Sequence, residues 1–173
     1  SVVYSQTKMN ADSIRGKMQW FADAKLGIFI HWGIYSVNGI DESWSFYNKK
    51  ISYEDYMKQL NGFNASRYRP DEWAALIRVS GAKYAVITAK HHDGVALWKT
   101  KQNHFNVFEN TPAKKDVLLP FYKALDKEGI KRGAYFSLID WSYPDYTGFL
   151  RDSNRYKISD NPGRWQRFTH FVQ

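Results

Sequence analysis

Histidines stand at two places in the sequence where a short apolar segment ends. His31 follows residues 26–30, and the pair His91-His92 follows residues 84–89, whose β-branched centre favours a strand buried on both faces. Neutral imidazoles both donate and accept hydrogen bonds, so they suit recognition of a hydroxyl-rich ligand such as a sugar. Since α/β proteins bind ligands at the carboxyl ends of parallel strands, we expect both strands to deliver their histidines to one rim.

The residues around the histidine pair are also ionisable. Adjacent side chains of an extended strand point to opposite faces, so His91 and His92 reach one ligand only if the backbone bends, which Gly94 permits. Asp93 is a candidate acid or base, or else a structural acceptor of strand-end amides. Lys90 pairs with a carboxylate or touches the ligand.

Zinc binding is the alternative interpretation of these side chains. His31, the pair His91-His92 and Asp93 are of the types that catalytic zinc takes as ligands. Their spacing is not one of the helical or strand signatures of that metal, and adjacent histidines seldom chelate one ion. We therefore expect hydrogen bonding to a ligand and no metal.

A third apolar segment, residues 131–138, predicts another strand and ends in Asp140-Trp141. Asp140 has the same two interpretations as Asp93, an acid or base or a structural acceptor. The succession of helix, glycine, strand and polar end occurs twice at a regular interval. This weak repeat of αβ units indicates a parallel sheet or barrel.

The remaining segments must position these strand ends. We expect helices from Asn10 or Asp12 to about Lys25, from Ser52 to before Asn61, from Pro70 to Gly81, from Asp116 to Gly129, and from Trp165 to Val172. Their inward-facing positions are expected to include Trp73, Leu76, Ile77, Leu119, Tyr122 and Leu125. Residues 1–10 predict a loose or β-like entry, and residues 34–50, 94–115 and 142–161 predict loops.

Composition limits the classes of function. The chain has 173 residues, 43% of them hydrophobic, which favours a folded globule without a membrane-spanning segment. Aromatic residues are abundant, with 7 Trp, 12 Tyr and 11 Phe, and many stand beside polar residues, as suits a sugar pocket. The net charge is +8, but Lys and Arg are scattered, so we expect no nucleic-acid partner. The absence of cysteine excludes disulfides and thiolate metal sites.

Three long motifs, at residues 26–36, 82–98 and 133–141, resemble the N-terminal half of the α-L-fucosidases of glycoside hydrolase family 29. The resemblance implies an α/β fold of the (β/α)8-like, TIM-type barrel class. It also implies a retaining exo-glycosidase that hydrolyses terminal α-L-fucosyl linkages in glycans. Because such a barrel takes about 250 residues, we expect residues 1–173 to be the N-terminal portion of a single catalytic domain. The rest of the barrel and any C-terminal β domain would lie outside it.

The resemblance also assigns roles to individual positions. The residues implied to bind fucose are His31, Trp44, His91, His92 and Tyr135, and those implied to shape the pocket are Trp32, Glu42, Asp140 and Trp141. The chain departs from the family at one of these motifs. The family has a Glu-Trp pair, whereas here Ser43 precedes Trp44 and the glutamate is one place earlier. This difference predicts a differently shaped loop.

No catalytic residue is expected within the chain. The resemblance places the aspartate nucleophile at the end of the next barrel strand and the acid/base carboxylate beyond that, both after Gln173. Retaining hydrolysis needs both carboxyl groups, about 5–5.5 Å apart. The 173 residues alone are therefore expected to supply sugar recognition but no activity, and no cofactor is expected.

Other functions stay open at this point. A lectin-like module would use the same aromatic residues to bind fucose without hydrolysis, and a metal-dependent hydrolase is a further alternative. The chain starts at Ser1 without a signal-like apolar core, as if a leader had been removed, so we expect a secreted, periplasmic or lysosomal protein. Association into oligomers is possible.

Overall fold

A computed structural model describes residues 11–148 and 155–172 of the chain, with the side chains of residues 11–15 left out. The expected β-like entry at residues 1–10 lies outside the described residues. The helices are α1 (Ala11–Ala24), α2 (Trp44–Tyr47), α3 (Tyr53–Met57), α4 (Pro70–Val79), α5 (Val107–Asn110), α6 (Leu118–Lys127) and α7 (Pro162–Val172), with 3₁₀ turns η1 (Ile34–Ser36) and η2 (Lys58–Gly62). The strands are β1 (Gly27–Ile30), β2 (Tyr84–Lys90), β3 (Val95–Ala96), β4 (Phe105–Asn106) and β5 (Lys131–Phe136).

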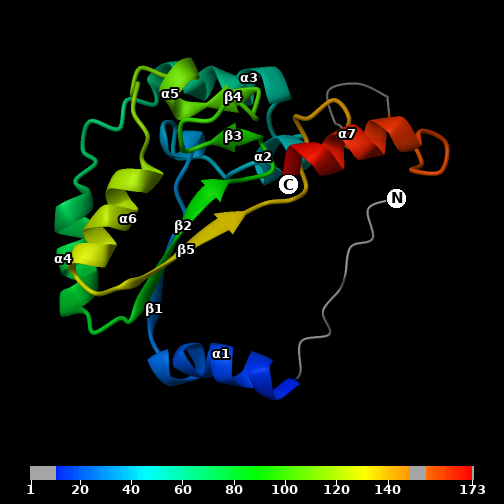
Figure 1. Cartoon of the computed structure of the whole chain (residues 1–173). Helices are drawn as coiled ribbons and strands as arrows, with labels where there is room; N and C mark the ends of the chain where they lie inside the picture. The colour runs from blue at the N-terminus through cyan, green and yellow to red at the C-terminus, as the bar shows by residue number, and fades with distance from the viewer. Residues whose placement is uncertain (1–10, 149–154, 173) are drawn as a thin grey trace.

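The sheet is built around β2. β1 and β5 both pair with β2 in parallel, and the short strand β3 pairs with the end of β2 in the antiparallel sense. α4 precedes β2, α6 precedes β5, and both helices cover the same face of the sheet (Figure 1). The predicted parallel αβ units are thus confirmed, in a mixed α/β sheet.

The two faces of the sheet differ. Ala85, Ile87 and Ala89 are buried on the face that α4 and α6 cover. The other face carries Phe29, which is 50% exposed, and Tyr135. These two rings lie 5.8 Å apart although β2 separates their strands. Side chains of the two outer strands thus meet across the open face of the sheet.

Several predicted helix signals are confirmed. The Ser52 hydroxyl accepts a hydrogen bond from the Asp55 amide at 3.0 Å and so caps α3, while Pro70 is the first residue of α4. Asp116 accepts from the amides of Leu118 and Leu119, both at 2.9 Å, at the start of α6. Oxygen acceptors thus satisfy the free amides at two helix starts.

The prediction that Leu76 and Leu119 point inward is wrong, since these residues are 69% and 52% exposed. The buried residues are instead Ala74 and Ile77 on α4, and Leu118, Phe121, Ala124 and Leu125 on α6. At 100° per residue, the exposed leucines lie roughly 130° (Leu76) and roughly 150° (Leu119) from the centre of their helix's buried face. A helix can thus place a leucine outward while a residue as small as Ala74 or Ala124 is buried.

The expected loops contain short elements. Residues 34–50 include η1 and α2, residues 94–115 include β3, β4 and α5, and the helix after Ser52 continues as η2 through Gly62. Elements of two to five residues are too short to show a hydrophobic period. β5 ends at Phe136, before the expected residue 138, and α7 begins at Pro162, before Trp165.

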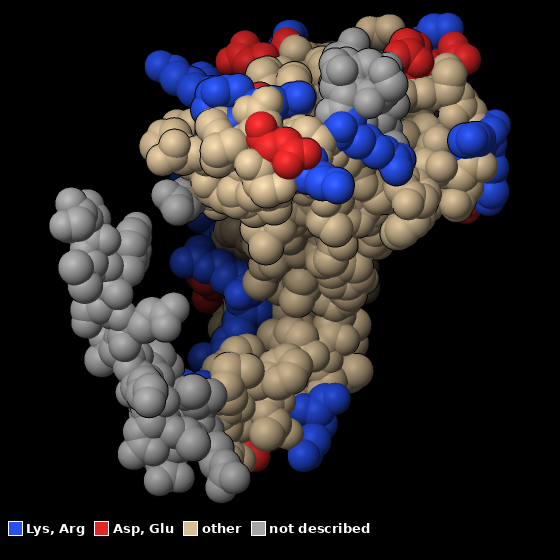
Figure 2. Space-filling model, turned by 90° about the vertical axis from the view of Figure 1, so that its right-hand side faces the viewer, with Lys and Arg blue, Asp and Glu red and all other residues tan. Residues whose placement is uncertain are grey.

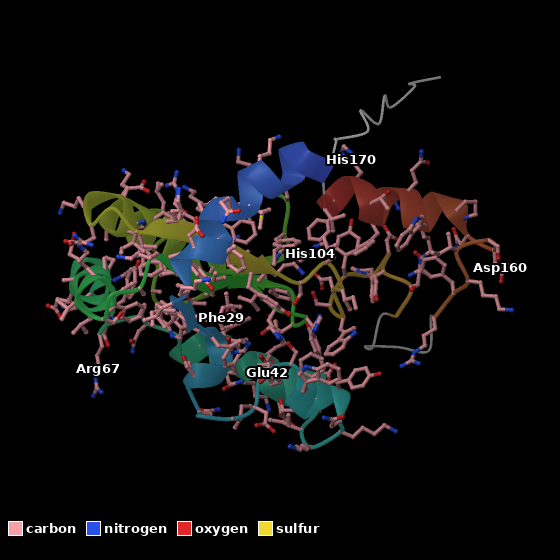
Figure 3. The ribbon with its side chains drawn as sticks, turned by 90° about the horizontal axis from the view of Figure 1, so that it is seen from below. Phe29, Glu42, Arg67, His104, Asp160 and His170 are labelled. Atoms are coloured by element: carbon pink, nitrogen blue, oxygen red, sulfur yellow. The ribbon has the colours of Figure 1, made fainter. Side chains whose placement is uncertain are left out.

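α1 lies at the amino ends of the strands, across the sheet in the view from below (Figures 1 and 3). Its Trp20 and Phe21 rings lie 6.1 and 5.2 Å from Tyr84, the first residue of β2. Gly27 leaves room for the Tyr84 ring, since a Cβ there would lie 2.1 Å from it. This aromatic contact fixes α1 at the end of the sheet opposite the histidines.

The basic side chains are scattered over the surface, as they are along the sequence (Figure 2). On the face shown in Figure 2, Lys and Arg are spread over the upper part of the molecule, along the left side of its middle and at its lower end, with other residues between them. Among the described residues, no helix has the length and apolar character to cross a bilayer.

Candidate functional site

The residues expected to bind the sugar lie together at the carboxyl ends of β1, β2 and β5. The ring centroid of His91 lies 5.2 Å from that of His31, 4.6 Å from that of His92 and 5.8 Å from that of Tyr135. Trp44 joins them from α2, with its ring 6.0 Å from that of His92. We call these five residues the histidine rim.

A turn after β2 brings the adjacent histidines to one side. The pairing of β2 with β5 is irregular between Thr88 and Lys90, and the Gly94 amide then donates to the His91 carbonyl at 3.1 Å. Gly94 has a φ of +81°, and a Cβ there would lie 1.8 Å from the Ser142 hydroxyl oxygen. Only glycine fits this turn, which supplies the expected bend.

His91 is held by a buried serine. Its Nδ1 lies 2.6 Å from the Ser43 hydroxyl oxygen, and both residues are buried. Burial, and then the neighbouring His92, His31 and Lys90, lower the pKa of His91 to about 3. The ring is therefore neutral at physiological pH.

His92 is held by backbone. Its Nδ1 lies 3.0 Å from the Ile139 carbonyl, which can only accept, so Nδ1 carries the proton and Nε2 has the lone pair. The Trp141 amide donates to the His92 carbonyl at 2.9 Å, and the two rings lie 4.3 Å apart. Burial lowers the pKa of His92. The segment after β5 thus fixes both the position and the tautomer of this ring.

His31 has a tyrosine partner. Its Nδ1 lies 3.0 Å from the Tyr35 hydroxyl, and burial raises the pKa of that hydroxyl, so Tyr35 keeps its proton. The Tyr35 hydroxyl can donate to Nδ1 or accept from it, so this contact fixes the position of the His31 ring, whereas His92 presents an acceptor at Nε2.

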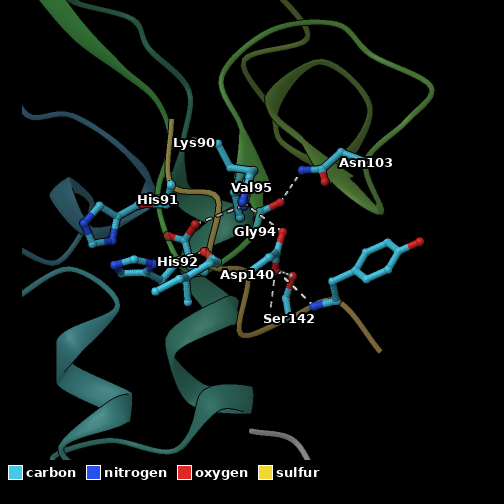
Figure 4. A network of polar contacts seen from close by, with 12 residues as sticks. Lys90, His91, His92, Gly94, Val95, Asn103, Asp140 and Ser142 are labelled. Atoms are coloured by element: carbon cyan, nitrogen blue, oxygen red, sulfur yellow. Dashed lines mark hydrogen bonds and ion pairs between the residues drawn. The ribbon is translucent and has the colours of Figure 1, made fainter. Parts of the chain in front are cut away.

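Lys90 and Asp140 form a fully buried ion pair behind the histidines, with 3.0 Å between Nζ and Oδ2 (Figure 4). The other oxygen of Asp140 accepts from the Ser142 amide and hydroxyl and from the Tyr143 amide, at 2.9, 2.6 and 3.0 Å. The structure thereby answers two open questions from the sequence. Lys90 pairs with a carboxylate, and Asp140 is a structural acceptor that ties the end of β5 to the end of β2.

Asp93 is likewise a buried acceptor. It accepts from the Tyr56 hydroxyl at 2.7 Å and from the Val95 amide at 2.9 Å. Burial raises the pKa of Asp93 to about 6, against the lowering effect of these hydrogen bonds. With both oxygens engaged inside the protein, Asp93 does not face the histidine rim.

The residues expected to shape the pocket are divided between two places. Trp141 is buried, with its ring stacked on Tyr47 at 4.5 Å and 5.1 Å from Trp44, so it backs the histidine rim. Glu42 precedes α2 (Figure 3), and its charge acts on the pKa of His92.

Trp32 lies elsewhere, because it follows His31 and so points to the opposite face of the sheet. Its ring lies 5.2 to 5.4 Å from Phe63, Tyr68 and Trp73, in an aromatic cluster under α4.

Sequence reasoning assigned no role to the residues that hold the histidines. Tyr35, Ser43 and Tyr56 are buried, come from the loop and helices after β1, and contact the rim or Asp93 directly. The one available signal was Ser43, where the chain departs from the resembled motif. In the described part of the chain, no group of His, Asp and Glu side chains is arranged to hold a metal ion.

Comparison with known proteins gives one consistent result. The family model described as Alpha-L-fucosidase matches residues 1–172. Over 148 residues the chain is 33% identical to the tissue alpha-L-fucosidase of Bos taurus, covering 77% of this chain and 31% of that protein. The chain therefore spans about a third of the length of the curated relatives it matches.

Solved structures agree. A glycoside hydrolase family 29 alpha-L-fucosidase from Bacteroides thetaiotaomicron has a TM-score of 0.76 and 35% identity, covering 90% of this chain and 35% of that one. A second structure from that organism is a trapped covalent intermediate in complex with 2-fluoro-fucosyl fluoride. It has a TM-score of 0.76 and 33% identity, covering 91% of this chain and 36% of that one.

Proposed function

Because the chain belongs to the alpha-L-fucosidase family, we propose that the protein containing it is a retaining exo-glycosidase that hydrolyses terminal α-L-fucosyl linkages in glycans. In this proposal residues 1–173 supply much of the fucose-binding pocket. The protein acts on fucosylated glycans in a secreted, periplasmic or lysosomal setting.

The observation that carries the proposal is the histidine rim. At the ends of three strands, the rings of His31, His92 and Tyr135 each lie within 6 Å of the His91 ring. These groups offer donors and acceptors for sugar hydroxyls, and Trp44, which is 41% exposed, offers an apolar face for the sugar's carbon skeleton. Such a set recognises a sugar without a metal.

Two further observations support the barrel fold and the retaining mechanism. The outer strands meet through Phe29 and Tyr135 on the face that α4 and α6 leave open, and the parallel strands β1, β2 and β5 lie side by side in chain order, as in the wall of a (β/α)8-like barrel. The Bacteroides structure is named as a trapped covalent intermediate, and a covalent glycosyl-enzyme belongs to the retaining mechanism. We take residues 1–173 as the N-terminal portion of such a barrel.

The positions of Asp93 and Asp140 separate sugar binding, which the described residues carry out, from the chemical step. Asp93 and Asp140 are buried and fully engaged in internal hydrogen bonds, so neither is free to attack or protonate a sugar. The described residues therefore bind and orient the fucosyl group. We propose that the nucleophile and the acid/base carboxylate come from outside residues 1–173.

Turnover of an aryl α-L-fucoside by the protein that contains this chain tests the proposal. An aryl β-D-galactoside is the control, because it has the same relative arrangement of ring hydroxyls on a sugar of opposite handedness. We expect release from the fucoside only. Binding of L-fucose without release would contradict the enzyme and favour a sugar-binding module.

The same assay tests the rim through His92→Ala. We expect kcat/KM for the fucoside to fall at least about tenfold, since a lost hydrogen bond to a charged or transition-state group costs about 1.5–3 kcal/mol. His104→Ala is the matched control, because His104 is exposed and packs on Tyr143, away from the rim. Equal kinetics in the two variants would show that the rim does not bind the substrate.

A further inference from the structure

The aromatic rings beside the histidine rim continue to a cavity outside it. Trp141, which backs the rim, lies 4.3 Å from His92 and is stacked on Tyr47 at 4.5 Å. Tyr47 also lies 5.0 Å from Trp44, so its ring is next to the rim without belonging to it. α2, which carries Trp44 and Tyr47, and α3 lie at the end of the sheet to which β2 and β5 point (Figure 1).

The cavity is lined by the end of α2, the start of α3, the segment between them and Arg155. Its volume is about 990 Å³, which is at the upper end of the range of small-molecule sites. Tyr47, which is 43% exposed, forms part of its wall. The cavity thus begins where the rim ends, and one extended ligand can contact both.

The charged side chains of the cavity wall indicate the chemistry of that ligand. Lys50 and Asp55 each form an ion pair with a neighbouring side chain. Among the described residues, no ion pair or hydrogen bond engages the side chains of Lys49, Glu54 and Arg155, which all line the cavity. Lys and Arg only donate hydrogen bonds and an ionised carboxylate only accepts them, whereas a sugar hydroxyl does both. Free groups of both signs beside an exposed ring therefore suit a neutral sugar better than an anion.

The position of the cavity fits the part of the glycan that leaves. In the proposed function the fucosyl group occupies the rim, and the sugar to which it is linked departs with the glycosidic oxygen. The contacts of Trp141 with both rings, at 4.3 and 4.5 Å, keep Tyr47 within reach of a sugar linked to a fucosyl group at His92.

We propose that the cavity beside Tyr47 is a subsite for neutral sugar residues of the leaving group. Tyr47 packs on a face of such a sugar, and Lys49, Arg155 and Glu54 form hydrogen bonds with its hydroxyls. The inference rests on the proposed function, which places the fucosyl group in the rim. Residues 1–173 would then select among fucosylated glycans as well as recognise fucose.

The double variant Lys49→Ala, Arg155→Ala tests the subsite in the protein that contains this chain. Both side chains are exposed, so we expect the variant to fold. Lys25→Ala is the matched control, because Lys25 is also an exposed lysine in the left-handed backbone region. Its φ is +58° and that of Lys49 is +59°, but Lys25 stands before β1, at the opposite end of the sheet from the rim.

The first readout compares leaving groups. Neutral trisaccharides, in which fucose is attached to the galactose or to the glucose of lactose, are compared with an aryl α-L-fucoside, which has no sugar in its leaving group. The ratio of the two kcat/KM values cancels any effect of a variant on the rim. For at least one trisaccharide we expect the double variant to lower this ratio about fivefold or more, the worth of a typical hydrogen bond, and Lys25→Ala to leave it unchanged. Equal ratios in the wild type and both variants would overturn the proposal.

The second readout serves if the wild type cleaves neither trisaccharide. Each is then added as an inhibitor of aryl fucoside turnover, and we expect inhibition that is about fivefold weaker in the double variant than in the wild type and in Lys25→Ala. A wild type that turns over the aryl fucoside but neither cleaves nor is inhibited by a trisaccharide would overturn the subsite alone. A wild type that is inert toward the aryl fucoside would overturn the proposed function and this inference with it.

Discussion

At the scale of single residues, His91 and Asp93 respond to the same burial in opposite ways. Burial lowers the pKa of His91 from 6.5 to about 3 and raises the pKa of Asp93 from 3.8 to about 6. His91 therefore contributes stability above pH 6.5 that is lost as the pH falls toward 3. Asp93 contributes stability below pH 3.8 that is lost as the pH rises through 6.

Between pH 4 and 6 the two contributions should cancel, and single variants should separate them. Relative to wild type, the free energy of unfolding of Asp93→Asn should rise with pH by about 1.4 kcal/mol per unit, and that of His91→Gln should fall by about the same amount. Urea unfolding at several pH values in this interval measures both slopes. Parallel curves for the wild type and both variants would contradict the opposite shifts.

The rim residues could be predicted because their positions follow from strand ends, as for His31 and His91. Their hydrogen-bond partners could not, because Tyr35 and Ser43 come from the segment after β1, whose short elements have no hydrophobic period. Trp32 shows that the alternation of side chains between the two faces of an extended segment must be taken into account. It adjoins His31 in sequence but packs on the helix-covered face with Phe63.

At the scale of elements, the turn after β2 depends on Gly94. Its φ is +81°, and a Cβ would lie 1.8 Å from Ser142 Oγ and 2.9 Å from Asp140 Oδ1, in the buried ion-pair network (Figure 4). Gly129→Ala is a matched control, because Gly129 has a φ of +67° but no atom within 4 Å of the added Cβ. The two substitutions share backbone strain and differ in crowding.

We expect Gly129→Ala to cost about 1 kcal/mol of unfolding free energy and Gly94→Ala about 2 kcal/mol more, with a loss of fucoside turnover only in Gly94→Ala. Thermal unfolding and the aryl fucoside assay measure the two effects. Equal destabilisation would show that Ser142 and Asp140 move aside without cost.

The ion pair of Lys90 and Asp140 shows which part of a contact between elements can be predicted from the sequence and which part cannot. That Lys90 needs a carboxylate follows from burial at the end of an apolar strand. The choice of Asp140 over Asp93 depends on how β5 pairs with β2, with Thr88 opposite Tyr135 and Lys90 opposite Phe136. Such a register joins residues about fifty positions apart and is set only when the sheet forms.

At the scale of the whole molecule, the sheet has one covered and one open face. α4 and α6 bury Ala85 and Ile87 on one side, whereas Phe29 is 50% exposed on the other. Among the described residues, β1 and β5 each pair on one side only, with β2. The parallel order was predictable from the αβ repeat, but the contact between Phe29 and Tyr135 was not, because it joins two strands that β2 separates and forms only with the sheet.

This open face leads to a prediction for residues 1–173 expressed on their own. Exposed apolar side chains and unpaired strand edges favour association with other molecules, so we expect the isolated polypeptide to bind a hydrophobic dye and to elute as an aggregate. The larger protein that contains it should do neither, since further strands would pair with both edges and cover Phe29. Because Asp93 and Asp140 are engaged internally, the isolated polypeptide should also release nothing from an aryl α-L-fucoside. Size-exclusion chromatography, dye fluorescence and the fucoside assay on both proteins make the comparison. A monomeric, dye-free and active polypeptide would mean that the described sheet is complete and that its own side chains carry out the hydrolysis.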